Sequence, residues 1–250
     1  MRVSICGRVL IESGPLTVDG DDFPGRLGRR LWAYAVLNRR RPIGRDELIT
    51  ALWGDAEPEA VDASLDSLLS RLRGTLARLR EPTLELRRSS GGYVLRLPAD
   101  TFVDRERAWS AIHHVQATRR QGDAAGAWAE AVIAREIVAR GFLPGDTGEW
   151  IEAERHLLRD IEVQALESIA DAELAQSRPL EAERVARALI ALEPLRESGY
   201  QLLMNALAAS GNAAQAARVM DECRAALASV ALTPSAETRR VFDSISSGSR

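Results

Sequence analysis

The sequence contains no lysine, and all 33 of its basic residues are arginine. This absence excludes chemistry that needs a lysine amine: the lysine of a phosphate-binding P-loop, a Schiff base, or a catalytic serine–lysine pair. Because arginine has GC-rich codons, we attribute the bias to the composition of the genome rather than to function.

Cysteine is also scarce, and the two residues present, Cys6 and Cys223, lie far apart. This excludes a disulfide framework and a zinc ribbon, and we interpret both as buried or half-buried thiols. The three histidines, His113, His114 and His156, have no partner at metal-ligand spacing. No glycine-rich loop or G-x-S-x-G elbow follows a strand pattern. We therefore expect no cofactor, no metal and no enzymatic activity.

Long hydrophobic runs are missing too. No apolar stretch approaches the roughly 18 residues needed to cross a bilayer. The N-terminal residues 1–7 alternate like a strand and lack the apolar core of a signal peptide. With 46% hydrophobic and 28% charged residues, the composition is that of a soluble globular protein. We expect a cytoplasmic protein without membrane contact, and its 250 residues favour two domains.

The net charge of −3 is distributed unevenly along the chain. Residues 1–100 hold 16 arginines against 14 acids, whereas residues 101–250 hold 17 arginines against 22 acids. A polyanionic partner should therefore meet the N-terminal part.

The N-terminal part begins with strand patterns and continues with helical ones. Apolar residues fall on alternate positions in the first 25 residues, which predicts a small antiparallel sheet. Helical spacing of apolar residues then predicts a helix over 29–38. Proline at position 42 interrupts the pattern, and a second helix is predicted over 45–54.

A third, longer helix carries one apolar stripe, with leucines spaced three and four residues apart over 61–79. Two strand-like runs around the turn Ser89–Gly92 follow it and predict a hairpin. Residues 98–101 then form the natural boundary between domain 1–100 and domain 101–250.

The second domain shows helical patterns and very little strand signal. Helices are predicted over 104–121, 123–140, 149–176, 179–192, 196–209, 213–228 and 236–245. Residues 211–216 match residues 177–182 at an offset of 34, and Ala216 aligns with Ala182. This is the period of tetratricopeptide repeats, which are pairs of helices that bury their apolar faces against neighbouring pairs.

The order of elements in the first domain is that of a winged helix-turn-helix, in which a helix enters the major groove and a hairpin wing reaches the adjacent backbone. The fold class we predict is therefore an α+β winged helix-turn-helix domain followed by an all-α tetratricopeptide-like domain. Opposite the leucine stripe, the long helix carries small residues that permit close approach to base edges. Arg71 and Arg73 flank them, and Arg87 and Arg88 lie on the wing, where guanidinium groups suit phosphate oxygens.

Three residues of the long helix argue against tight binding. Asp62 and Asp66 carry negative charge where phosphates would lie, and Gly74 weakens a helix by roughly 1 kcal/mol relative to alanine. A second interpretation therefore stays open: a tetratricopeptide-like protein-interaction module whose winged helix contacts protein and no longer binds DNA. The two interpretations differ in the salt dependence of binding, because phosphate contacts release counterions and DNA affinity therefore falls with salt.

Several stretches resemble the SARP family of antibiotic-pathway regulators, which combine an OmpR-type winged helix with a bacterial transcriptional activator domain. In the first domain these are Leu27–Arg30, Leu48–Gly54, Leu69–Arg73 and Gly91–Leu95. In the second they are Val103–Asp104, Trp150–Arg155, Glu193–Glu197, Leu203–Gly211 and Leu232–Thr238.

This resemblance implies an activator that binds promoter repeats in double-stranded DNA as a homodimer or higher assembly and contacts RNA polymerase. It makes residues 60–79 the recognition helix and the loop from Trp53 to Pro58 the polymerase contact, through Trp53, Gly54, Asp55 and Glu57. Pattern and resemblance together predict DNA contacts from Arg29, Arg30, Ser64, Ser67, Ser70, Arg71, Arg73, Arg87, Arg88, Ser89, Ser90 and Tyr93.

Overall fold

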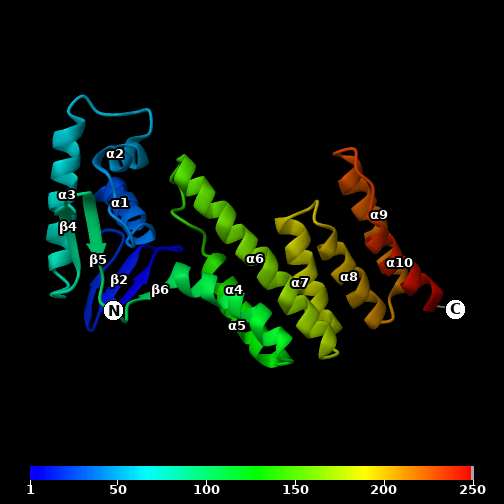
Figure 1. Ribbon diagram of the computed structural model, residues 1–250. Coiled ribbons are helices and arrows are strands. Elements are labelled where there is room, and N and C mark those ends of the chain that lie inside the picture. Colours follow the sequence, from blue (N-terminus) through cyan, green and yellow to red (C-terminus); the bar gives the residue numbers. More distant parts are fainter. Residues whose placement is uncertain (249–250) are drawn as a thin grey trace. The chain divides into compact units, whose positions relative to one another are not determined.

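The computed structural model describes residues 1–248, which are mostly helical with a small sheet near the N-terminus (Figure 1). The strands are β1 (Arg2–Ser4), β2 (Leu10–Ser13), β3 (Leu16–Val18), β4 (Glu85–Ser89), β5 (Gly92–Arg96) and β6 (Phe102–Val103). The helices are α1 (Gly25–Leu37), α2 (Arg45–Trp53), α3 (Val61–Ala77), α4 (Asp104–Arg120), α5 (Ala124–Val138), α6 (Glu149–Ala175), α7 (Pro179–Leu192), α8 (Glu197–Ala209), α9 (Ala213–Ala228) and α10 (Ala236–Gly248). None of these helices is both long enough and apolar enough to span a bilayer.

The chain packs into two compact units. The first contains residues 1–107 and 137–158, and the second contains residues 108–136 and those from 159 onward. Residues 137–158 therefore pack with the N-terminal elements, although they follow residue 100 in sequence. The division into domains 1–100 and 101–250 stays a prediction, and the two packing units have different bounds.

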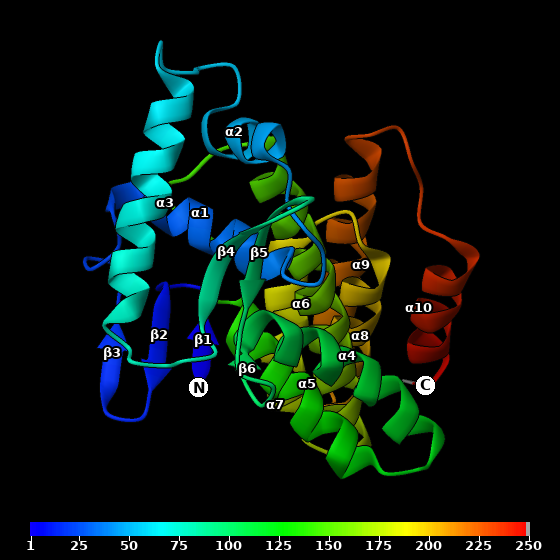
Figure 2. The same ribbon diagram turned by 60° about the vertical axis from the view of Figure 1, so that its left-hand side comes forward.

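The first unit has a four-stranded sheet of order β3-β2-β1-β6 and a two-stranded sheet formed by β4 and β5. Strand β1 is antiparallel to β2, with Val3 opposite Ile11, and parallel to β6; Figure 2 shows β3, β2 and β1 side by side. Val3, Ile11 and Val18 point into the core and are fully buried, as the alternating pattern predicts. The strand β6 has only two residues, too few for any periodicity to predict.

The helices α1 and α3 bury their apolar stripes in the same unit. Leu31 and Trp32 of α1 are fully buried. The leucine stripe of α3 is buried along the helix, at Leu65, Leu68, Leu69, Leu72 and Leu76. Because the leucines of α3 are all used in this packing, the opposite face of the helix is left to solvent.

The segment 137–158 contacts α1 and the end of α2. The indole Nε1 of Trp150 donates to the carbonyl oxygen of Ala51 at 2.9 Å, and its ring meets Tyr34 edge-on at 5.0 Å. Asp146, a buried carboxylate, accepts a hydrogen bond from Arg26 Nε at 2.5 Å. These polar contacts belong to the packing of the first unit, and the helical periodicity of the segment did not predict them.

The second unit repeats its backbone geometry at the offset of 34 seen in the sequence. Ser177 and Gly211 both have positive φ, 55° and 75°. The amide that follows each donates back across the turn, from Arg178 to the Glu173 carbonyl and from Asn212 to the Leu207 carbonyl. The two interhelical turns therefore have the same form.

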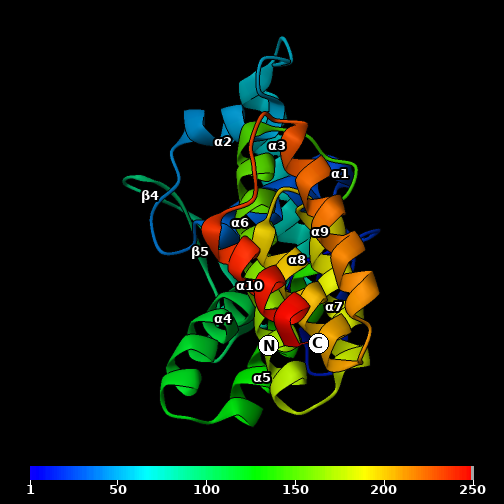
Figure 3. The same ribbon diagram turned by 90° about the vertical axis from the view of Figure 1, so that its right-hand side faces the viewer.

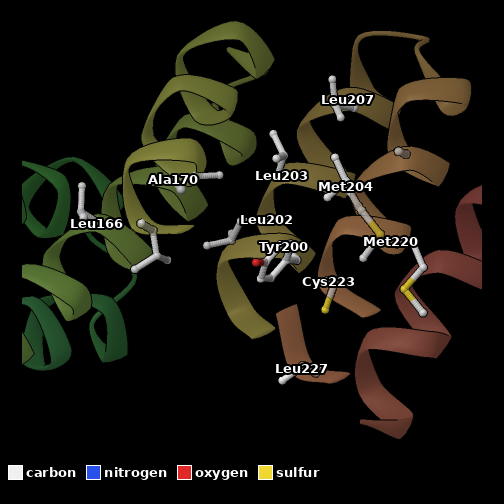
Figure 4. Close-up of a cluster of buried hydrophobic side chains, with 14 of the residues drawn as sticks. Leu166, Ala170, Tyr200, Leu202, Leu203, Met204, Leu207, Met220, Cys223 and Leu227 are labelled. Carbon is white, nitrogen blue, oxygen red and sulfur yellow. The ribbon is translucent and has the colours of Figure 1, made fainter. Parts of the chain in front are cut away.

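A continuous apolar core joins α6 to α10 in this unit. Figure 4 shows Leu166 and Ala170 of α6 facing Leu203 and neighbouring side chains of α8, and Met220 of α9 beyond them. Ala182 and Ala216, the aligned small residues of the repeat, are both fully buried. Small side chains at these positions allow close approach of neighbouring helices.

The Trp150→Phe variant tests the contact between α6 and the end of α2. It keeps most of the ring and removes the donor to the Ala51 carbonyl, so the free energy of unfolding should fall by about 1 kcal/mol. Urea unfolding followed by circular dichroism measures this. Leu157→Ala, at an exposed position of the same helix, should change stability by less than about 0.5 kcal/mol. Equal stabilities of wild type and Trp150→Phe would contradict this role of Trp150.

Candidate nucleic-acid interface

The exposed surface of α3 carries small polar residues, with Arg71, Arg73 and the acids Asp62 and Asp66 beside them. Ser67, Ser70 and Arg71 are exposed, and Ser64 is half-buried. Gly74 is exposed on the same helix, and a Cβ added there would meet no atom within 4 Å. The predicted base-facing residues of α3 are therefore brought together on one accessible surface.

Arg45, at the start of α2, joins α3 to the hairpin. Its Nε donates to Asp62 Oδ1 at 2.7 Å, and its Nη1 donates to Asp66 Oδ1 at 2.8 Å and to the Tyr93 hydroxyl at 2.9 Å. A further bond from Nη2 reaches the Asp62 carbonyl. The sequence did not predict a role for Arg45, because its position at the start of a helix gave no indication of partners 17 and 21 residues away.

The positive charge of Arg45 partly offsets the negative charges of Asp62 and Asp66, which argue against tight DNA binding. Hydrogen bonding from Arg45 lowers the pKa of Asp66, and the positive charges of Arg88 and Arg73 lower it further. Hydrogen bonds to Asp66 and Asp62 also raise the pKa of Arg45. Both acids are therefore exposed to solvent, but each is ion-paired with Arg45.

A cleft of about 420 Å³ lies between α3 and the hairpin and is lined by Arg73, Arg87 and Arg88. Arg73 Nε donates to the carbonyl oxygen of Leu86 at 2.7 Å, which ties the helix to β4. Glu85 is the one acid among the lining residues. Three guanidinium groups around an open cleft suit a phosphate backbone.

The hairpin is anchored at its base and exposed at its tip. Tyr93 is only 4% exposed, and its backbone N–H and carbonyl both bond to Ile43 at 2.8 Å. A side chain at Gly92 would collide with the Ile43 carbonyl, because its Cβ would lie 2.1 Å from that oxygen. Ser89 and Ser90 are exposed at the tip, which projects from the body of the unit in Figure 3.

Two predicted DNA-contacting arginines have other partners. Arg29 Nη1 donates to the Gly20 carbonyl at 3.0 Å. The Arg30 side chain is only 11% exposed, donates to the Ala51 carbonyl at 2.9 Å, and lies 3.9 Å from Asp146. A DNA contact from either residue stays a prediction, and in the structure these bonds engage both side chains with other parts of the protein.

The loop after α2 holds the four predicted polymerase-contacting residues. Gly54 adopts a positive φ of 58°, and Gly54, Asp55 and Glu57 are exposed. Trp53 is half-buried and, with Ser67 and Arg71 of α3, lines a shallow groove of about 430 Å³. This loop and α3 therefore share one edge of the unit.

A polar groove of about 420 Å³ lies in the second unit, between α4, α6, α8 and α10. Amide and carboxylate side chains, among them Gln164, Gln201 and Asn205, line it together with aliphatic side chains. Within residues 1–248, no cluster of three or more histidine, cysteine or acidic side chains is arranged to hold a metal ion.

Comparison with known proteins defines the class of this chain. The family model of the bacterial transcriptional activator domain matches residues 103–246. The match covers more than half of the chain, so the protein belongs to the bacterial transcriptional activator domain family. This confirms the resemblance to SARP-family transcriptional regulators drawn from the sequence.

Two transcriptional regulators share extended sequence similarity. The regulatory protein AfsR of Streptomyces coelicolor is 34% identical over 200 residues, which is 80% of this chain and 20% of AfsR. The transcriptional regulatory protein EmbR of Mycobacterium tuberculosis is 40% identical over 93 residues, which is 35% of this chain and 24% of EmbR. The matched parts thus span about a fifth to a quarter of these relatives.

A solved structure agrees over almost the whole chain. The structure of M. tuberculosis EmbR in complex with a low affinity phosphopeptide matches 99% of this chain and 65% of that chain, with 25% identity and a TM-score of 0.83. The order of a small N-terminal sheet followed by many helices is therefore shared with a transcriptional regulator.

Gly74 provides a test of how the face of α3 is built. Because a Cβ meets open space there, Gly74→Ala should raise the free energy of unfolding by about 0.5–1 kcal/mol, through helix propensity and a less flexible unfolded chain. The matched variant Gly92→Ala should instead destabilise the protein, because of its positive φ and the collision with Ile43. Urea unfolding measures both, and a destabilising Gly74→Ala would mean that this part of α3 is packed against other atoms.

Proposed function

We propose that this protein is a sequence-specific, duplex-DNA-binding transcriptional regulator, acting as an activator in the cytoplasm. The elements α1, α2, α3 and the β4–β5 hairpin would serve as a winged helix-turn-helix, with α3 as recognition helix and the hairpin as wing. The observation that carries this proposal is the single accessible surface of α3, with its small polar face and the neighbouring arginine cleft.

The surface suits duplex DNA in both shape and charge. The small side chains of Ser67 and Ser70 allow the helix to approach base edges, and Arg71 lies beside them to read a guanine or hold a phosphate. Arg73, Arg87 and Arg88 would contact the backbone. We propose no base contact for Tyr93, whose hydroxyl accepts a hydrogen bond from Arg45 and thereby supports the hairpin.

The remaining parts would connect DNA binding to transcription. We propose that the loop with Trp53, Gly54, Asp55 and Glu57 contacts RNA polymerase, supported by its exposure beside α3. The residues from 101 onward would form a tetratricopeptide-like domain for self-association or signal input, supported by the turns repeated at an offset of 34. Association on repeated sites would raise the effective concentration of each DNA-binding surface.

The second candidate is a protein-interaction module without enzymatic activity. The polar groove between α4, α6, α8 and α10 favours it, because a groove across repeated helices suits a partner segment. In that case the winged helix would contact protein. Binding would then show neither the loss on arginine substitution nor the fall with salt that DNA binding would show.

The first experiment is selection of random duplex oligonucleotides by the purified protein at about 0.15 M salt. We expect enrichment of a repeated motif by the wild type and loss of enrichment by Arg71→Ala. Arg184→Ala, which removes an exposed arginine of the second unit, is the matched control and should enrich the same motif. No enrichment by folded wild-type protein would favour the interaction module.

Salt dependence tests the phosphate contacts separately. Each phosphate contact contributes about −0.9 to the slope of log K against log salt, so Arg88→Ala should make the slope shallower by about one. Fluorescence anisotropy on the selected duplex, between 0.05 and 0.3 M salt, would measure it. An unchanged slope would show that Arg88 does not contact a phosphate.

A further inference from the structure

Asp62 and Asp66 lie on the side of α3 that the proposed function assigns to DNA, and they are more accessible than the arginine that binds them. Their side chains are 75% and 65% exposed, whereas Arg45 is 27% exposed. An approaching duplex would therefore meet the carboxylates before the guanidinium. Because four of the five N–H donors of the Arg45 guanidinium are used in bonds to Asp62, Asp66 and Tyr93, its position suits an internal partner better than a phosphate ligand.

From this arrangement we propose that Arg45 is the internal counter-ion of α3. It is a positioning residue that offsets one of the two negative charges of Asp62 and Asp66 at the DNA-facing surface and holds the first two turns of α3 against the hairpin. This inference rests on the proposed function, and it assigns a role to a residue that contacts no DNA.

Arg45 also keeps Arg73 of α3 and Arg88 of the hairpin available. Asp66 lies within the electrostatic field of Arg88 and Arg73 as well as that of Arg45. Without Arg45, Asp66 would attract these two guanidinium groups and compete with phosphates for them. Loss of one cation would then weaken DNA binding in two ways: by exposing two uncompensated carboxylates, and by drawing cations away from the backbone.

The bond from Arg45 to Tyr93 links this counter-ion to the geometry of the hairpin. Tyr93 lies directly opposite Arg88 in the β4–β5 register, and its hydroxyl accepts the Arg45 Nη1 hydrogen bond. One guanidinium therefore sets the spacing between the start of α3 and the strand position that faces Arg88.

The test compares three variants, Arg45→Gln, Asp62→Asn with Asp66→Asn, and the triple substitution, by anisotropy on the selected duplex and on a scrambled one. Arg45→Gln should weaken binding by about tenfold or more at 0.15 M salt, and the triple variant should return to within about threefold of wild type. The double variant should bind both duplexes more tightly and discriminate less between them, because it gains positive charge without any base contact.

Arg8→Gln, which removes an exposed ion pair with Asp19 in the same unit, is the matched control and should bind like wild type. Thermal unfolding of each variant reports folding. If Arg45→Gln fails to fold, the double variant Asp62→Asn with Asp66→Asn tests the inference. An unchanged DNA affinity of this variant would mean that the two acids do not face DNA.

Three results would overturn the inference: a triple variant as weak as Arg45→Gln, Arg45→Gln binding like wild type, or unchanged affinity of the double variant. A wild type that binds neither duplex would instead contradict the proposed function, which separates the two failures.

Discussion

Burial of the leucine stripe of α3 is the constraint on which the candidate site depends. With Leu65, Leu69 and Leu72 fixed in the core, the rotation of α3 about its axis is determined, and so is the face that it presents to solvent. The serines, Arg71 and Gly74 become a surface because the leucines are not free to turn outward. Burial of about five leucines, each contributing roughly 1.5–3 kcal/mol of hydrophobic free energy, far outweighs what any surface ion pair supplies.

Periodicity explains why so much of this fold could be predicted. The spacing of apolar residues located α2, α3 and α7 almost to the residue, and the hairpin followed from its glycine-containing turn. The two-residue strand β6 and the docking of residues 137–158 on the N-terminal elements could not be predicted in this way, because both depend on pairing between distant segments. Asp104 illustrates the same limit: its carboxylate accepts the backbone amides of Ile5 and Cys6, almost a hundred residues away.

The candidate site shows a similar division between local and distant information. The face of α3 and its arginines could be predicted from helical geometry alone. The partners of Arg30, and the Arg45 network that offsets Asp62 and Asp66, depend on tertiary contacts and were not predictable from spacing. An unexpected acid on an otherwise suitable helix is therefore a reason to search other elements for its cation.

Photochemical cross-linking to duplex DNA tests the central claim most directly. A selected duplex with photoreactive bases would be irradiated with the full chain, and the attached peptides would be identified by mass spectrometry. The account predicts attachment within residues 61–74 and at the hairpin tip around residues 88–91. Attachment confined to α7, α8, α9 or α10 would contradict it, because the N-terminal surface would then not be where this protein meets DNA.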